Sequence, residues 1–425
     1  MKTNSNFIYL NGLYWENKVE EIEQSVENNT LSLTEVKARK VGKKGPTHRI
    51  IEGDNLGALH LLEKNKEKFE LIYIDPPYNT GNKDFKYTDA YFNSEDESRH
   101  STWSSFIYKR LVKAKQLLSD NGVIFLAIDD AEQARLKLIC DGIFGEQNFV
   151  ANFIRKNKAG SGHDSKQVAV EFDYMLCYAN NINTLVFNQE TVDVESDSKY
   201  KFEDQFVKRR GKYYLRDLDY KGSYSKTLDY EITAPDGTQM LSGGAFGKPN
   251  TWRWGKAKFK WGIKNDYIVF KETPKGWKVY IKQYQFVDNK DEIRIRKLPH
   301  RALIDFNNSK GSNELKDILK QDIFSYPKPT DLLQFVIDLI PHKDIRILDF
   351  FAGSGTTLHA TMLQNKKDGG ERSCTLITNN ENNICKEVTY ARNKAVIEGY
   401  ETRRGKKIDG LTQNQLHYFK VTSKK

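Results

Sequence analysis

Apolar residues recur along two parts of this chain in a pattern that predicts alternating strands and helices. Short apolar runs predict buried strands at 49–52, 71–74, 123–128, 174–178, 345–350 and 374–378. Helical periodicity predicts helices at 16–28, 56–62, 106–118, 131–140, 331–340 and 356–365, and the polar residues 120–122 are expected to end the third of these. Such alternation is typical of an α/β fold with a largely parallel sheet.

The charge of the chain indicates a polyanionic partner. Its 425 residues include 67 Lys and Arg against 57 Asp and Glu, which gives a net charge of +10. Nucleic acid is the simplest partner for such a surplus, and an ordinary lysine-rich surface is the alternative. Four cysteines without paired spacing predict reduced thiols. With neither a signal peptide nor a membrane-spanning run in the sequence, we expect a cytoplasmic protein with no membrane partner.

The stretch 71–78, Leu-Ile-Tyr-Ile-Asp-Pro-Pro-Tyr, predicts a strand that ends in a rigid corner. Neither proline can donate to a sheet, and each restricts the residue before it. Ligands of open α/β sheets bind at the carboxyl ends of the strands, where this corner is expected. The Asp75 carboxylate can accept hydrogen bonds and Tyr78 offers a flat face. The corner therefore suits a planar base that carries an amino group, and a purely structural Pro-Pro turn is the alternative.

A second stretch, 349–357, has the sequence Asp-Phe-Phe-Ala-Gly-Ser-Gly-Thr-Thr and predicts a strand, a glycine loop and a helix. Glycines let the backbone approach a ligand closely, and a helix N-terminus offers free N–H groups. The loop lacks the third glycine of a dinucleotide fingerprint, and no Gly-Lys-Ser/Thr of a phosphate loop follows. Its meaning depends on the Asp-Pro-Pro-Tyr corner far upstream.

Together, these two motifs resemble the β class of amino-group DNA methyltransferases, and most of all the modification subunits of type III restriction–modification systems. The resemblance covers about residues 45–180 and 322–395. It implies a Rossmann-like, S-adenosylmethionine-dependent methyltransferase fold that is circularly permuted, with the catalytic motif first. The implied parts are an N-terminal arm (1–45), a catalytic half (46–180), a target-recognition domain (181–321), a cofactor-binding half (322–400) and a basic tail (401–425).

The resemblance also implies roles for single residues. Asp75, Pro76, Pro77 and Tyr78 would hold a flipped adenine. The residues expected at S-adenosylmethionine are Asp54, Asp75, Lys328, Asp349, Phe351, Gly353, Gly355, Thr356 and Glu381. Among these, Asp54 could also be only a helix N-cap, and Phe351 could be plain core. Glu381 is chosen because an acid after the second strand of a nucleotide fold binds ribose hydroxyls.

Residues 181–321 interrupt the strand–helix alternation and are rich in Lys, Arg, Tyr and Trp. A β-hairpin is expected through 267–270 and 277–281. Basic side chains follow phosphates, so we interpret this part as the region that recognises DNA; a small structural insert is the alternative. The DNA-contact candidates are Lys208, Arg209, Arg210, Arg253 and Lys256, with Lys158 in a basic loop at 156–163. Aromatic residues of a second loop could stack on bases: Phe85, Tyr87, Tyr91 and Phe92.

The predicted function is methylation of adenine N6 in double-stranded DNA. N4-cytosine methylation is the nearest alternative, although related cytosine enzymes usually carry Ser where Asp75 stands. RNA methylation and a non-catalytic DNA-recognition subunit are further alternatives. A second copy of the chain and a restriction subunit are candidate partners. No metal is expected, because the eight histidines show no ligand spacing.

Overall fold

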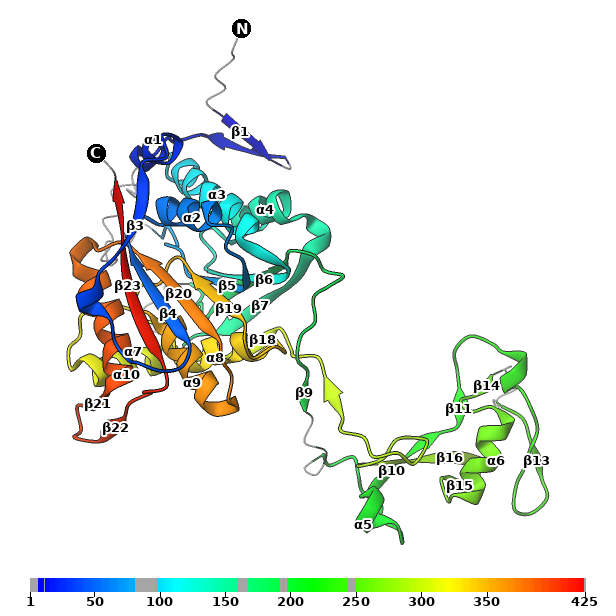
Figure 1. Cartoon of the computed structure of the whole chain (residues 1–425). Coiled ribbons are helices and arrows are strands. Elements are labelled where there is room, and N and C mark those ends of the chain that lie inside the picture. Colours follow the sequence, from blue (N-terminus) through cyan, green and yellow to red (C-terminus); the bar gives the residue numbers. More distant parts are fainter. Residues whose placement is uncertain are drawn as a thin grey trace. The chain divides into compact units, whose positions relative to one another are not determined.

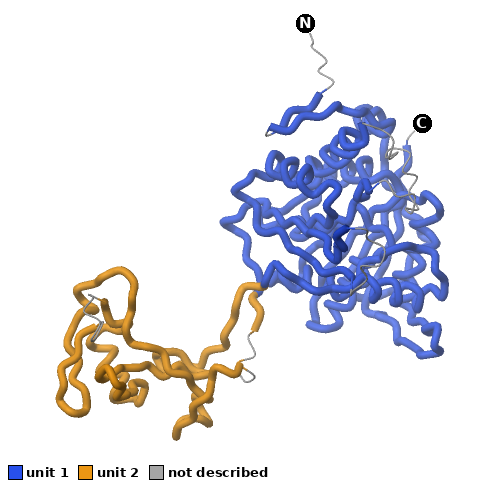
Figure 2. Tube along the Cα trace, turned by 180° about the vertical axis from the view of Figure 1, so that it is seen from behind, with its two compact units in different colours: residues 1–188, 301–425 blue, residues 189–300 orange. Residues whose placement is uncertain are grey.

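The computed structural model of this chain describes residues 7–10, 12–80, 98–158, 167–191, 194, 197–242 and 250–423. The chain divides into two compact units, one formed by Met1–Asn188 with Arg301–Lys425 and the other by Gln189–His300 (Figure 2). The second unit is shorter than the insert expected at 181–321. The difference arises because residues on both sides of it join the first unit.

A ten-stranded sheet forms the centre of the first unit (Figure 1). In spatial order its strands are β18 (Leu303–Asp305), β7 (Phe149–Lys156), β8 (Phe172–Ala179), β6 (Leu118–Ile128), β5 (Phe69–Ile74), β19 (Arg346–Asp349), β20 (Ser373–Thr378), β4 (Thr47–Glu52), β23 (Gln415–Ser423) and β3 (Leu31–Glu35). Strands β8 and β3 run antiparallel to their neighbours, and the other pairings are parallel. The predicted α/β fold is therefore confirmed.

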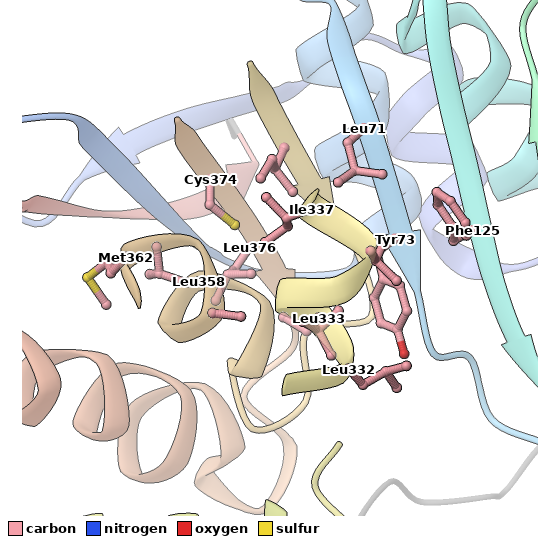
Figure 3. Packing of buried hydrophobic residues seen from close by; sticks show 14 of the residues in the cluster. Leu71, Tyr73, Phe125, Leu332, Leu333, Ile337, Leu358, Met362, Cys374 and Leu376 are labelled. Carbon is pink, nitrogen blue, oxygen red and sulfur yellow. The ribbon is translucent and has the colours of Figure 1, made fainter. Parts of the chain in front are cut away.

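Helices cover both faces of this sheet (Figure 1). Helices α2 (Asn55–Lys64), α3 (Arg99–Leu117) and α4 (Gln133–Phe144) pack on one face, and α7 (Asn308–Leu319), α8 (Thr330–Asp338), α9 (Thr356–Asp368) and α10 (Ala391–Glu398) pack on the other. Buried hydrophobic side chains form one cluster on each face of the sheet. Side chains alternate along β5, so Leu71 and Tyr73 join the cluster on the face covered by α8, while Ile72 and Ile74 join the cluster on the face covered by α3. Figure 3 shows Leu71 and Tyr73 together with Leu332, Leu333 and other residues of the cluster on the face covered by α8.

The two ends of the chain take part in the sheet, which the sequence interpretation missed. Strand β23 lies in the segment expected to be a basic tail, and it pairs with β4 and with β3 of the expected N-terminal arm. The alternation of buried Leu416 and Tyr418 was the available signal for β23. The remaining small elements of this unit are β1 (Phe7–Leu10), β2 (Leu13–Glu16), α1 (Glu21–Glu27), η1 (Lys37–Arg39), η2 (Glu146–Asn148), η5 (Glu381–Asn383), η6 (Ile384–Tyr390), β21 (Gly399–Glu401) and β22 (Lys407–Asp409).

Two expected boundaries need correction. Residues 120–122 do not form a turn after the third helix, because α3 ends at Leu117 and β6 begins at Leu118. The helix expected at 16–28 is only α1, since Leu13–Glu16 pairs as a strand with Phe7–Leu10. The strands expected at 49–52, 71–74, 174–178, 345–350 and 374–378 are all present within two residues at each end, and the strand expected at 123–128 begins five residues earlier, at Leu118.

The second unit is built on a three-stranded antiparallel sheet in the order β10 (Tyr213–Asp217), β16 (Gly276–Tyr284), β15 (Ile268–Thr273). Strands β15 and β16 form the expected hairpin. Two helices, α5 (Val207–Arg210) and α6 (Lys256–Lys264), and a short turn, η3 (Lys226–Leu228), accompany the sheet. Three small ladders complete the unit: β9 (Glu190–Thr191) with β17 (Lys297–Leu298), β11 (Asp219–Tyr220) with β14 (Thr251–Trp252), and β12 (Ile232–Thr233) with β13 (Gln239–Met240).

Candidate active site

A cavity of about 650 Å³ opens in the first unit where the parallel strands end. Segments that follow β4, β5, β6, β19 and β20 supply its walls, because the carboxyl ends of parallel strands meet at one edge of a sheet. The predicted residues on this wall are Asp54, Asp75, Pro76, Pro77, Tyr78, Lys158, Lys328, Asp349, Phe351, Gly353, Thr356 and Glu381. Two motifs more than 250 residues apart in the sequence thus line one cavity.

The Asp-Pro-Pro-Tyr corner is held together by a triangle of polar groups. The Tyr78 hydroxyl donates to Asp75 Oδ1 over 2.8 Å, and Lys328 Nζ donates to the same oxygen and to the Tyr78 hydroxyl, each over 2.8 Å. Burial, together with the charge of Asp75, raises the pKa of the Tyr78 hydroxyl well above its ordinary value. Trp103 Nε1 donates to the Pro77 carbonyl over 2.7 Å. Lys328, expected at the cofactor, therefore contacts the corner directly.

The residue after the corner is fixed by a buried carboxylate that the sequence interpretation missed. Asn79 has a left-handed backbone with φ of 58°, which Asn tolerates better than most residues. Its Nδ2 donates to Glu132 Oε1 over 2.5 Å, and His100 Nδ1 lies 2.6 Å from the same oxygen. Glu132 is fully buried. The direction in which the chain leaves Tyr78 is therefore set by a side chain 53 residues further on, a contact that spacing alone does not reveal.

The glycine loop adopts left-handed backbone angles that favour glycine. Gly353 and Gly355 have φ of 46° and 74°, and a Cβ atom at Gly355 would overlap the side-chain amide of Asn393. Thr389 Oγ1 donates to the Gly353 carbonyl over 2.6 Å. Arg392, which is fully buried, donates to Ser354 Oγ over 3.1 Å and to Thr356 Oγ1 over 2.6 Å. The segment η6–α10 thus fixes the shape of the loop from behind.

Asp349 ends strand β19 and is buried, and both oxygens of its carboxyl group accept hydrogen bonds. Its Oδ1 accepts from the Phe351 N–H over 3.0 Å, and its Oδ2 accepts from Thr357 Oγ1 over 2.5 Å. Burial raises the pKa of this carboxyl to about 7. Phe351 itself lines the cavity and packs against Phe106, with ring centroids 5.7 Å apart. It is therefore both a cavity residue and part of the packing between β19 and α3.

Asp54 is the N-cap of α2 and also lies on the cavity wall, while its contact with the cofactor stays a prediction. Its Oδ1 accepts from the backbone N–H of Leu56 over 2.8 Å and caps α2, while the residue also lines the cavity. Arg110, which is buried, pairs with Asp54 Oδ2 at 3.4 Å and with Glu20 at 2.8 Å. Glu381 begins the turn η5 on the cavity wall.

The candidate DNA contacts differ in their surroundings. Lys158, Lys208, Arg209 and Lys256 are exposed, although Arg209 pairs with Asp291 at 2.6 Å. Arg253 is half-buried, with Nε donating to the Asp217 carbonyl over 2.9 Å. Arg210 lies inside the second unit, only 3% exposed. The loop aromatics Phe85, Tyr87, Tyr91 and Phe92 and residues 159–163 lie outside the described residues.

Arg210 occupies a cage of aromatic rings. Its guanidinium carbon lies 3.9 Å from the ring centroid of Phe206, 4.7 Å from that of Tyr267 and 5.2 Å from that of Tyr284. Its Nε atom lies 2.9 Å from Asp291 Oδ1. These contacts stabilise the second unit from within, a role that the sequence interpretation did not foresee.

The described part of the chain lacks two kinds of feature. No three His, Cys, Asp or Glu side chains among those residues are grouped so that they could hold a metal ion. No described helix is both long and apolar enough to cross a membrane.

Comparison with known proteins gives consistent matches. A family described as DNA methylase matches residues 69–389. The type III restriction-modification enzyme StyLTI Mod subunit of Salmonella typhimurium is 32% identical over 88% of this chain, and the chain spans 58% of that relative's length. The type II methyltransferase M.KpnI of Klebsiella pneumoniae is 30% identical over 87% of each chain. Among solved structures, PvuII DNA methyltransferase (cytosine-N4-specific) aligns with a TM-score of 0.40 at 10% identity, over 83% of this chain and 90% of that one.

Proposed function

This chain belongs to the DNA methylase family, and from that premise we propose that it transfers a methyl group from S-adenosylmethionine to N6 of adenine in DNA. The observation that carries the proposal is one cavity lined both by the Asp75–Tyr78 corner and by Gly353 and Ser354 of the glycine loop. A transferase needs its two reactants side by side, and this cavity offers one motif for each.

The fit of the cofactor rests on the glycine loop. The loop passes close to the cavity without side chains at Gly353 and Gly355, and Thr356 begins α9, whose first N–H groups have no intrahelical partner. We assign this loop to the cofactor, with Glu381 at its ribose hydroxyls and Asp54 and Phe351 on the same wall. When bound, S-adenosylmethionine supplies an electrophilic methyl group on a sulfonium centre.

The corner has to make a weak nucleophile react. The lone pair of the adenine amino group is delocalised into the ring, so the nitrogen attacks poorly unless it is positioned and its protons are held. In our proposal, Asp75 and the Pro76 carbonyl accept hydrogen bonds from the two N–H groups of the amino group, and the carboxylate stabilises the positive charge that develops on N6. Tyr78 and Lys328 both donate to Oδ1, so we assign Oδ2 to the amino group.

An adenine inside a duplex cannot reach this cavity, so the base must leave the stack. We propose that Tyr78 stacks on the extruded base and that the second unit recognises the target DNA. The exposed Lys208, Arg209 and Lys256 support that assignment. Because the StyLTI relative is named as a Mod subunit of a restriction-modification enzyme, a restriction subunit is a proposed partner, as is a second copy of the chain. Circular permutation of the fold stays a prediction.

The substitution Asp75→Ala tests the proposal. It should slow transfer of labelled methyl groups to genomic DNA by about 10³-fold, because it removes the charged acceptor at the reacting nitrogen. Binding of S-adenosylmethionine, measured by equilibrium dialysis, should remain within about twofold of the wild-type affinity. Asp344→Ala, at an exposed acid ahead of β19, is the matched control and should change neither quantity.

Two results would count against this assignment. Transfer at an undiminished rate by Asp75→Ala would exclude Asp75 from the chemistry. Loss of cofactor binding together with transfer would show that Asp75 holds the cofactor and not the base.

A further inference from the structure

Tyr73 lines the same cavity and carries a buried hydroxyl that has no partner among the described residues. Tyr73 stands two residues before Asp75 on β5, is 2% exposed, and lines the cavity. Within the described part of the chain its hydroxyl has no hydrogen-bond partner. Figure 3 shows the Tyr73 ring beside Leu332 and Leu333 of α8. Buried polar atoms are nearly always paired, so an unpaired hydroxyl on a ligand cavity points to an atom of the ligand.

The position of Tyr73 on the strand relates it to the catalytic corner. Side chains alternate along a strand, so Tyr73 and Asp75 point to the same side of β5, with backbones about 7 Å apart. Burial, together with the charge of Asp75, raises the pKa of the Tyr73 hydroxyl well above its ordinary value. The hydroxyl therefore keeps its proton and serves as a hydrogen-bond donor next to Asp75.

The charged groups near Tyr73 are occupied with one another. Arg155 Nε donates to Asp173 Oδ1 over 2.7 Å, and Arg155 Nη1 donates to Asn308 Oδ1 over 2.9 Å. Burial opposes ionisation of Asp173, but the hydrogen bond from Arg155 and nearby cations outweigh it and lower the pKa of this carboxyl. This ion pair is satisfied within the protein, which leaves the Tyr73 hydroxyl as a donor for a bound molecule.

An adenine taken out of a duplex loses the two hydrogen bonds that its Watson–Crick edge made to thymine. For adenine, N6 donates to the partner base and the adjacent ring nitrogen N1 accepts from it. Asp75 offers an acceptor for the first of these bonds, and Tyr73 offers a donor for the second. Enzymes that extrude bases commonly recognise this edge.

We propose that the Tyr73 hydroxyl donates a hydrogen bond to N1 of the target adenine while Asp75 holds its N6 amino group. The inference rests on the proposed function, since it assigns a second contact to the base in that site. Tyr73 and Asp75 together replace the two bonds that the adenine made to thymine.

The test combines a protein variant with a base analogue. Sequencing of genomic DNA methylated by the protein gives the target site, and duplex oligonucleotides are then made with either adenine or 1-deazaadenine at the methylated position. The analogue keeps the amino group and lacks only the ring nitrogen N1. Both duplexes are methylated by the wild type and by Tyr73→Phe, which keeps the ring and removes the hydroxyl.

Tyr178→Phe is the matched control. Tyr178 is also buried, on the antiparallel strand β8, which β6 separates from β5, but it belongs to the cluster on the other face of the sheet. Its hydroxyl donates to Asp141 over 2.7 Å, away from the cavity residues. Thermal melting and cofactor binding of both variants establish that each is folded.

Tyr73→Phe should lower kcat/KM on the adenine duplex by about tenfold, as expected for one lost hydrogen bond to a ligand. On the 1-deazaadenine duplex the wild type and Tyr73→Phe should agree within about twofold, because the partner of the hydroxyl is already absent. Weaker pairing of the analogue affects both proteins equally and cancels in this comparison. Tyr178→Phe should follow the wild type on both duplexes.

Tyr73→Phe with wild-type kcat/KM on adenine, or a tenfold difference that persists on 1-deazaadenine, would overturn the inference while leaving the proposed function intact. A wild-type protein that methylates no DNA would overturn the proposed function, and this inference with it.

Discussion

The two units of this chain bury different kinds of side chain. The clusters of the first unit are mostly aliphatic and lie on the two faces of a sheet. The cluster of the second unit is half aromatic, with Trp252, Trp254, Phe259, Tyr267 and Tyr284 among its ten buried members. Buried cations accompany these rings, since Arg210 and Lys282 are 3% and 5% exposed.

This difference shows what basic and aromatic composition can mean. In the second unit it builds part of the interior: Lys282 Nζ pairs with Asp204 and Asp266, each at 2.8 Å, and lies 5.1 Å from the ring centroid of Tyr213. A buried charge of this kind is tolerated because it is paired and surrounded by ring faces. A segment rich in Lys, Arg, Tyr and Trp can therefore form either a DNA-binding surface or part of a core. The burial of its side chains decides between the two.

The largest expected effect comes from breaking the aromatic cage of the second unit. Arg210→Met should destabilise that unit by about 4 kcal/mol, because it removes a desolvated cation from three rings and from Asp291. Hydrogen exchange measured by mass spectrometry should speed up in peptides from 189–300 and stay unchanged in peptides from β19 and β20.

The neighbouring Arg209→Met is the control for that experiment. Arg209 is exposed, so its loss should leave hydrogen exchange nearly unchanged. It should instead weaken DNA binding similarly for all sequences, and the slope of log affinity against log salt concentration should become shallower by about one. Equal destabilisation by both variants would remove the distinction between an internal and a surface arginine.

A smaller effect is expected at the glycine loop of the first unit, where a backbone angle is the critical feature. Gly355→Ala should cost about 3 kcal/mol, from the left-handed φ and from overlap with Asn393. Cofactor affinity should fall at the same time, because the loop has to shift. Chemical denaturation and equilibrium dialysis measure the two effects.

Gly369→Ala separates the two causes. Gly369 follows α9 with φ of 69°, but a Cβ atom there would meet nothing within 4 Å. This variant should lose only about 1 kcal/mol and bind the cofactor normally. If the two glycine variants behaved alike, overlap with Asn393 would have no part in shaping the loop.

The smallest effect concerns the pH dependence of the first unit. Asp349 keeps its proton up to a pKa of about 7 in the folded chain, whereas the unfolded chain releases it near 3.8. The unfolded state therefore binds fewer protons between these values, and the contribution of Asp349 to stability falls as the pH rises, by about 2 kcal/mol from pH 5 to pH 7. Urea denaturation at several pH values should show this loss for the wild type relative to Asp349→Asn. Parallel stability curves for the two proteins would show that Asp349 is ionised throughout.

Much of the first unit follows from the sequence because its strands are short apolar runs. The apolar runs at 71–74 and 345–350 predicted the two strands whose following residues line the cavity. These strands pair in parallel, so their carboxyl ends lie at the same edge of the sheet. Strand β7 escaped notice because Arg155 is buried in it, which is possible only through its pairing with Asp173 on β8. A pairing of that kind depends on strand order, and local periodicity does not contain it.

The candidate site divides in the same way. The residues that carry a motif, such as Asp75, Tyr78 and Gly355, could be named in advance. The residues that support them could not, since Trp103, Glu132 and Asn393 act through contacts across the fold. Tyr73 belongs to a strand that the sequence identified, but only its unpaired hydroxyl makes it a candidate contact to the base.

The most direct test of the central claim is the chemical identity of the methylated base. Purified protein is incubated with labelled S-adenosylmethionine and genomic DNA that carries no prior methylation, and the digested nucleosides are separated. The account predicts label in N6-methyladenine. Label in N4-methylcytosine would contradict the base assignment while keeping amino-group transfer, and DNA without label under conditions where the cofactor binds would contradict the proposed function itself.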